Sequence, residues 1–120
     1  MDGEWVEVAD AAELAPAQVV DAAVGDRDLV VWRTAGGEAC VMEARCPHEW
    51  SHLGAEGVVD GDEIVCTAHW WRFAPDGTGT KLNVKGRRDR KADIEVFECR
   101  ERAGRVEAWV PGATPGTSAG

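Results

Sequence analysis

Residues 46–73 read CPHEWSHLGAEGVVDGDEIVCTAHWWRF, and they contain two short cysteine–histidine pairs. The first pair is Cys46-Pro47-His48 and the second is Cys66-Thr67-Ala68-His69, with the seventeen residues 49–65 between them. Each pair suits the tip of a tight loop, and the stretch between them is long enough for a hairpin that brings the two tips together. Two thiols and two imidazoles at one place form the donor set of a metal centre. The pattern therefore predicts one metal site that two loops hold from both sides.

Two kinds of centre use this donor set. In a Rieske [2Fe–2S] centre two cysteines hold one iron and two histidines hold the other. A Cys2His2 zinc site is the alternative, but its usual spacing pairs cysteine with cysteine and histidine with histidine. The chain has only three histidines, and two of them fall in the pattern. Residue types and spacing favour the iron–sulfur centre, while zinc and a pattern without metal stay open.

The flanking residues resemble the two cluster loops of Rieske domains: a C-P-H-x4-L-G first loop and a C-x-x-H second loop that leads into an aromatic strand. The sequence DGTG at residues 76–79 further resembles the small Rieske ferredoxins of multicomponent bacterial monooxygenases of the toluene and alkene type. The resemblance implies one [2Fe–2S] cluster per chain. By this resemblance Cys46 and Cys66 bind the buried iron, and His48 and His69 bind the exposed iron.

The chain also departs from the high-potential members of that family. Those proteins carry an extra cysteine in each loop and form a disulfide, whereas Ser51 and Ala68 stand at these positions here. They also place a serine and a tyrosine after the second histidine, where this chain has Trp71 and Phe73. Fewer hydrogen bonds to the sulfurs stabilise the reduced cluster less. We therefore expect a reduction potential near the low end of the Rieske range, about −150 mV.

The resemblance implies an electron-transfer protein without a catalytic site of its own. It would carry single electrons from a flavin-dependent reductase to the oxygenase (hydroxylase) component of a mono- or dioxygenase. A mononuclear 2-His-1-carboxylate iron site needs two further histidines, and only His52 remains. Two alternatives stay open: the Rieske small subunit of a larger oxidoreductase, of the nitrite reductase or arsenite oxidase type, and a zinc-binding or redox-sensing module.

The pattern along the chain is all-β. A length of 120 residues suits one core, so residues 1–110 are expected to form a single domain. We expect an antiparallel β-sandwich or small barrel with a cluster-binding subdomain of two loops at about residues 44–74. A short helix is expected at residues 9–15 and a disordered tail at 111–120. The expected strands are 5–8, 18–24, 29–33, 39–44, a hairpin over 57–66 that turns at Asp60-Gly61, 72–74, and 94–98 paired with 105–110 around Ala103-Gly104.

Charge is unevenly distributed. Residues 1–63 hold 15 acids and 3 bases, and residues 64–120 hold 7 acids and 10 bases, which gives −12 and +3 and a total of −9. An acidic protein of this kind is not expected to bind nucleic acid. No apolar run predicts a signal peptide or a membrane span, so a cytoplasmic monomer is expected. The basic run at residues 81–91 is either a solvated loop or a docking patch for an acidic redox partner.

The remaining notable side chains have structural interpretations. Cys40 and Cys99 lie in strand-like runs and are expected to be small buried hydrophobic residues. His52 is expected to be exposed or to pack in its loop. Trp5, Trp32 and Trp109 are expected in the core. Trp50 and Trp70 adjoin the expected ligands, where they either shield the cluster from water or form a docking rim.

Overall fold

The computed structural model describes residues 3–47 and 52–111. Their secondary structure is almost entirely strand, with one short helix and one 3-10 turn. The elements in chain order are β1 (Gly3–Asp10), η1 (Ala11–Glu13), β2 (Val19–Val24), β3 (Arg27–Arg33), β4 (Ala39–Glu43), α1 (Leu53–Glu56), β5 (Gly57–Asp60), β6 (Glu63–Cys66), β7 (Trp71–Phe73), β8 (Gly79–Leu82), β9 (Arg88–Arg90), β10 (Val96–Phe97), β11 (Cys99–Arg102) and β12 (Arg105–Pro111). Among the described residues, no helix is long and apolar enough to cross a membrane.

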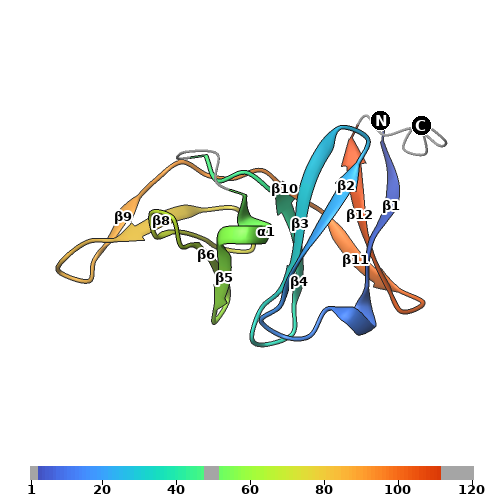
Figure 1. Ribbon diagram of the computed structural model, residues 1–120, viewed down its shortest axis with the longest axis horizontal. Coiled ribbons are helices and arrows are strands. Elements are labelled where there is room, and N and C mark those ends of the chain that lie inside the picture. The colour runs from blue at the N-terminus through green and yellow to red at the C-terminus, as the bar shows by residue number, and fades with distance from the viewer. Residues whose placement is uncertain (1–2, 48–51, 112–120) are drawn as a thin grey trace.

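Two antiparallel sheets form a sandwich. One sheet has the order β1-β12-β11 and the other has the order β10-β4-β3-β2. Buried and less buried residues alternate along β12, as expected for a strand with one face on a core. The core between the sheets contains Leu29, Val31, Val41 and Val106, among others. Figure 1 shows this sandwich on the right of the molecule.

A third sheet forms a smaller lobe beside the sandwich. Its five strands follow the chain in the order β5-β6-β7-β8-β9, and all of its pairings are antiparallel. With α1 it makes the lobe on the left of Figure 1. The chain enters this lobe after β4 and returns to the sandwich at β10. The expected fold class is therefore confirmed: an all-β antiparallel sandwich with a subdomain that contains the cysteine–histidine loops.

Backbone contacts join the lobe to the sandwich. The amide of Ala35 donates to the carbonyl of Gly61 at 2.8 Å, and the amide of Leu53 donates to the carbonyl of Ala44 at 2.8 Å. Gly54 approaches β2 so closely that a Cβ placed on it would lie 1.6 Å from Asp21 Oδ1. The first cysteine–histidine loop is thus anchored at the junction of the lobe and the sandwich.

Several expectations about the sandwich need correction. The expected helix at residues 9–15 is only the three-residue turn η1, because β1 continues to Asp10. The strand that pairs with β12 around Ala103-Gly104 is β11, whereas β10 pairs with β4. The reason is that the chain crosses from one sheet to the other between Phe97 and Cys99. Pro111 belongs to β12, and the rest of the expected tail, 112–120, lies outside the described residues.

The three tryptophans expected in the core differ in how deeply they are buried. Trp32 is fully buried, but Trp5 and Trp109 are only half-buried. The rings of Trp5 and Trp109 pack edge to face with their centroids 5.7 Å apart. They occupy paired positions on β1 and β12, on the face of that sheet turned away from its buried residues. Trp50 lies outside the described residues.

Candidate metal centre

The loop that carries Cys46 begins where β4 ends. An isolated antiparallel bridge between Arg45 and His52 closes the loop at its base. The side chain of Glu43 accepts hydrogen bonds from the amides of Ala44 at 3.0 Å and Arg45 at 3.4 Å. Cys46 itself is 1% exposed. The loop therefore starts from a fixed strand end, with its first predicted ligand in the interior.

The second loop connects β6 to β7. Cys66 is the last residue of β6, where it pairs with Gly57 on one side and Trp71 on the other. A tight turn follows, in which the amide of Trp70 donates to the carbonyl of Cys66 at 2.6 Å. Cys66 is 1% exposed, and His69 in the turn is half-buried. This turn places a buried thiol and a partly accessible imidazole three residues apart.

Direct hydrogen bonds join the two loops. Thr67 donates to the carbonyl of Glu56 twice, from its amide at 2.8 Å and from its hydroxyl at 2.7 Å. Glu56 ends α1, which follows the first loop, and Thr67 directly follows the second predicted cysteine ligand. The spacing between the loops is therefore set by a contact within the protein, before any metal is considered.

The described residues fit a [2Fe–2S] cluster. Cys46 and Cys66 belong to one buried cluster of side chains with Leu53, Ile64 and Phe73, so both cysteines lie in an apolar interior. Thiolates in such surroundings are the ligands that iron–sulfur clusters use, and imidazole is their replacement in a Rieske centre. Within residues 3–47 and 52–111, no three Cys, His, Asp or Glu side chains form a group that could hold a lone metal ion. His48 lies outside these residues, so the four-residue ligand set stays a prediction.

Trp70 has an unusual backbone conformation. Its φ is +66°, in the left-handed region that favours glycine, and its side chain is 59% exposed. A bulky residue costs about 1–2 kcal/mol there. The exposure favours the interpretation of Trp70 as part of a docking rim over its interpretation as a shield.

His52 packs in its loop, as expected. Its side chain caps α1, because Nδ1 accepts a hydrogen bond from the amide of Gly54 at 3.0 Å. The same nitrogen lies 3.8 Å from Asp21 Oδ1. His52 thus holds the exit of the first loop against β2.

A network of charged side chains braces the five-stranded sheet. Glu63 on β6 accepts hydrogen bonds from Arg72 on β7 at 2.8 Å and from Arg88 on β9 at 2.7 Å, and Arg72 also pairs with Asp60. The Glu63 side chain is only 11% exposed. Burial would raise the pKa of Glu63, but the hydrogen bonds from Arg88 and Arg72 outweigh it and hold the pKa below its usual value. No local sequence pattern predicts this network, because the partners of Glu63 lie 9 and 25 positions away from it.

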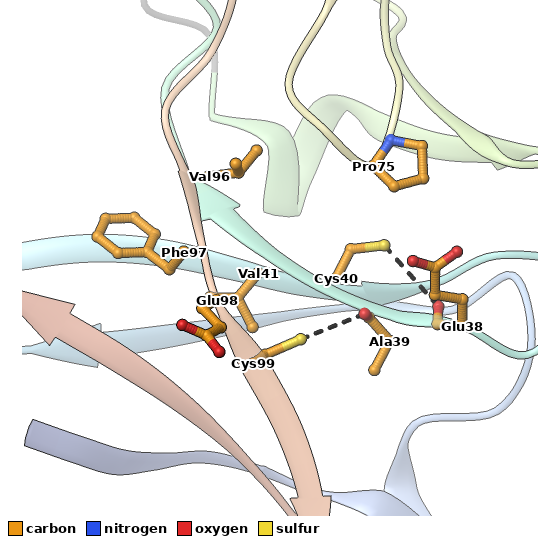
Figure 2. Close-up of a pocket in the computed structure, with 9 residues that line it drawn as sticks. All are labelled: Glu38, Ala39, Cys40, Val41, Pro75, Val96, Phe97, Glu98 and Cys99. Atoms are coloured by element: carbon orange, nitrogen blue, oxygen red, sulfur yellow. Dashed lines mark hydrogen bonds between the residues drawn. The ribbon is translucent and has the colours of Figure 1, made fainter.

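Cys40 and Cys99 line a cavity of about 410 Å³ at the edge of β4 (Figure 2). Burial raises the pKa of Cys40 to about 12, and burial also raises the pKa of Cys99. The Cys99 thiol donates to the carbonyl of Ala39 at 3.2 Å. Both thiols are therefore protonated at neutral pH, which makes them poor nucleophiles and poor metal ligands. This supports the interpretation of both cysteines as small hydrophobic residues.

Comparison with known proteins agrees with this geometry. The sequence model of the protein family described as Rieske [2Fe-2S] domain matches residues 4–98 of the chain. Over 88% of its length the chain is 29% identical to "Cholesterol 7-desaturase nvd 1" of Ciona intestinalis, but it spans only 22% of that protein. The solved structure of NdmA from Pseudomonas putida CBB5 matches 87% of the chain with a TM-score of 0.75 and 25% identity, over 33% of its own length.

Another solved structure contains a chain that is matched over almost its whole length. It is described as "Complex of reduced oxygenase and oxidized ferredoxin in carbazole 1,9a- dioxygenase", and one of its chains matches with a TM-score of 0.71 and 27% identity. The match covers 92% of this protein and 94% of that chain. The desaturase and NdmA are three to five times as long as the part that this chain matches. The residues 4–98 that match the family include both cysteine–histidine pairs of this chain. The chain belongs to the Rieske family and forms a Rieske [2Fe-2S] domain, the electron-transfer module that binds a two-iron cluster.

Proposed function

We propose that this protein is a Rieske ferredoxin that carries single electrons from a flavin-dependent reductase to an oxygenase component. The observation that carries the proposal is the match over 94% of a chain in the carbazole dioxygenase oxygenase–ferredoxin complex. This chain and the matched chain of that complex correspond over almost all of both lengths, whereas the desaturase and NdmA are matched over only a fraction of theirs. The cytoplasmic and monomeric state stays a prediction of the sequence.

In this function the chain's residues hold, insulate and expose the centre. The proposed ligands are Cys46 and Cys66 on one iron, and His48 and His69 on the other. A bound [2Fe–2S] cluster supplies reversible one-electron chemistry. Cys46 and Cys66 are buried and would shield a bound cluster from water, whereas the half-buried His69 would be the more accessible ligand to a docked partner. No substrate has to enter the protein for this exchange.

The proposal is tested first by electron paramagnetic resonance of the anaerobically purified, dithionite-reduced chain, with iron and zinc counted on the same sample. We expect two irons per chain and a rhombic signal with a mean g value below 2. The variants C46S, C66S and H69A should lose the signal, while C40S and C99S serve as matched controls and should keep it. A colourless protein that holds zinc would overturn the proposal.

The transfer step needs its own assay. With NADH, a flavin-dependent ferredoxin reductase and cytochrome c, the rate of cytochrome reduction should rise in proportion to the concentration of this chain. A rate independent of the chain would contradict a carrier function even if the cluster were present.

A second candidate function follows from the longer relatives. The desaturase from Ciona intestinalis is about five times as long as its matched part, so this domain could instead serve a catalytic domain in a larger oxygenase. The mass of the native polypeptide that contains this sequence separates the two candidates. A native polypeptide several times the mass of this chain, active as an oxygenase, would favour the second.

A further inference from the structure

The basic run at residues 81–91 is part of a β-hairpin. Strands β8 and β9 pair from Thr80 with Arg90 to Leu82 with Arg88, and the turn between them is formed by residues 83–87. In Figure 1 this hairpin projects from the lobe, away from the sandwich. We call residues 81–88 the basic arm.

Strand register places the basic arm at the same end of the sheet as His69. Arg72 on β7 pairs with Thr80 on β8, and these strands run antiparallel. The first residue of β7, Trp71, therefore lies at the same end as Leu82, the last residue of β8. His69 and Trp70 directly precede β7, so the turn of the arm extends beyond the edge at which the second loop emerges.

The arm exposes both apolar and positively charged side chains. Val84 is 103% exposed and Leu82 is 42% exposed, which are unusual values for aliphatic side chains. Lys85 and Arg87 are also exposed. In the part of the chain that the structure describes, neither of these two bases forms an ion pair. The arm thus carries two exposed basic side chains, Lys85 and Arg87, close in sequence to the exposed Val84.

The turn is held in shape by its own hydrogen bonds. Asn83 Oδ1 accepts from the amides of Lys85 at 2.9 Å and Arg87 at 3.1 Å, and Gly86 takes the positive φ of +78° that the turn requires. At the base, Arg88 donates to Glu63 at 2.7 Å and to Thr80 at 3.0 Å. An ordered arm loses little conformational entropy when a partner binds.

The charge of the rest of the chain determines which partner fits. Residues 1–63 have a net charge of −12, and the whole chain has −9. An acidic surface is repelled by most of this protein and attracted by the arm, so attraction and repulsion together orient it towards the His69 end. The net charge of −9 also disfavours binding to nucleic acid, whose partners need a basic surface.

We propose that the basic arm docks an acidic electron-transfer protein, with Lys85 and Arg87 steering the encounter and Val84 and Trp70 in the contact. The partner then lies over the end of the sheet that carries His69. This inference rests on the proposed function. It adds that the surface of the redox partner that docks here is acidic.

The test uses two redox proteins of opposite charge as probes. The dithionite-reduced full chain is mixed in a stopped-flow instrument with an acidic plastocyanin or with basic cytochrome c. One electron leaves the chain and reduces one copper or one haem iron. The arm variant K85E/R87E is compared with the control R102E/R105E, which changes the net charge equally beside the β11–β12 turn. Arg105 has only a surface pair with Glu7 to lose, at 3.2 Å, so the control should fold normally.

At low ionic strength we expect K85E/R87E to slow the reaction with plastocyanin roughly tenfold and to flatten its salt dependence. The control should change the rate much less, about twofold, and K85A/R87A should fall between. With cytochrome c the arm variant should react at least as fast as the wild type. Each variant is first checked for an unchanged resonance signal.

Three results would overturn the proposal that the basic arm docks an acidic redox partner. Equal slowing by the arm variant and the control would show that only net charge counts. No slowing of the reaction with plastocyanin would exclude docking at the arm. Binding of the wild type to phosphatidylglycerol vesicles or to a short DNA duplex at physiological salt, lost in K85E/R87E, would assign the arm to a polyanion. A wild type that holds two irons but reduces neither probe would instead overturn the proposed function, and the arm with it.

Discussion

Thr67 donates both its amide and its hydroxyl to one carbonyl oxygen, that of Glu56, at 2.8 and 2.7 Å. This pair is the direct connection between the segment after the first ligand loop and the start of the second. We expect T67V, which removes only the hydroxyl, to lower the free energy of unfolding by about 1 kcal/mol. It should also speed loss of iron to a chelator. Urea unfolding and chelator kinetics measure both effects, and T67S, which keeps the hydroxyl, should behave as the wild type.

Glu63 lies between two guanidinium groups and is only 11% exposed. Replacing it with glutamine removes the buried negative charge and leaves Arg72 with the exposed Asp60 as its counter-charge. Weakening charged hydrogen bonds in this way costs about 2 kcal/mol. We expect E63Q to unfold at correspondingly lower urea concentration. The control is E95Q, since Glu95 is 58% exposed and lies 3.8 Å from Arg27. That variant should cost less than about 0.5 kcal/mol, and an equal loss in both would contradict a special role for Glu63.

The same glutamate makes stability depend on pH. The pKa of Glu63 is lower in the folded protein than in the unfolded chain, so its contribution is fully present above the unfolded value and is lost as the pH falls through the folded value. Below about pH 4.3, the ordinary pKa of glutamate, the wild type should therefore lose part of its advantage over E63Q. Unfolding at several pH values between 3 and 7 tests this. A difference between the two proteins that stays constant with pH would contradict it.

Trp70 occupies a backbone conformation that suits glycine. Because its side chain is 59% exposed, W70G removes strain while giving up little packing. We expect the variant to be more stable by about 1 kcal/mol. Thermal unfolding checks this, and A103G is the matched comparison, since Ala103 has a φ of +53° in a turn away from the ligand loops. Destabilisation by W70G alone would show that the indole makes a larger contribution than its exposure suggests.

Gly79 leaves no room for a side chain. A Cβ there would lie 2.0 Å from the carbonyl oxygen of Ala92, a backbone atom held by the neighbouring segment. G79A should therefore cost about 3 kcal/mol through forced backbone shifts. G36A is the control, because the nearest atom to a Cβ at Gly36 is 3.8 Å away and belongs to the side chain of Thr34. Chemical denaturation of both variants is the measurement, and a stable G79A would contradict the close packing of β8.

Two aromatic residues of β7, the strand after the second loop, bear on the reduction potential. Trp71 is half-buried and Phe73 is fully buried, and neither carries a hydroxyl. A mediated redox titration should give a potential near about −150 mV. A value above about +100 mV would require hydrogen bonds to the sulfurs from elsewhere in the chain.

The part of this molecule that could be predicted from sequence is the part with local signals. The turn that carries Cys66 and His69 follows from their spacing, and the β5–β6 hairpin follows from Asp60-Gly61 between apolar runs. The β8–β9 hairpin could not be found in this way. Its strands lack alternation, and its base depends on the pair between Arg88 and Glu63, 25 positions apart. A run of charges gives no sign of such a partner.

The same reasoning applies to backbone conformation and to strand pairing. A tryptophan after a histidine does not reveal a φ of +66°, since that angle is imposed by the turn that returns the chain to β7. β11 has the sequence CRER, which offers no apolar alternation, and it becomes a strand because β12 supplies a partner. Tertiary contacts determine both the backbone conformation of Trp70 and the strand β11, and the local sequence predicts neither.

The pairing of β1 with β12 has a consequence for synthesis of the chain. Gly3–Asp10 has β12 as its partner in the sheet, and that partner spans Arg105–Pro111. At roughly 5–20 residues per second a ribosome needs several seconds to a few tens of seconds to reach β12. During that time the lobe with both ligand loops has already emerged, while β1 remains unpaired. The nascent chain can therefore begin to assemble its metal-binding lobe before its first strand has a place in the sandwich.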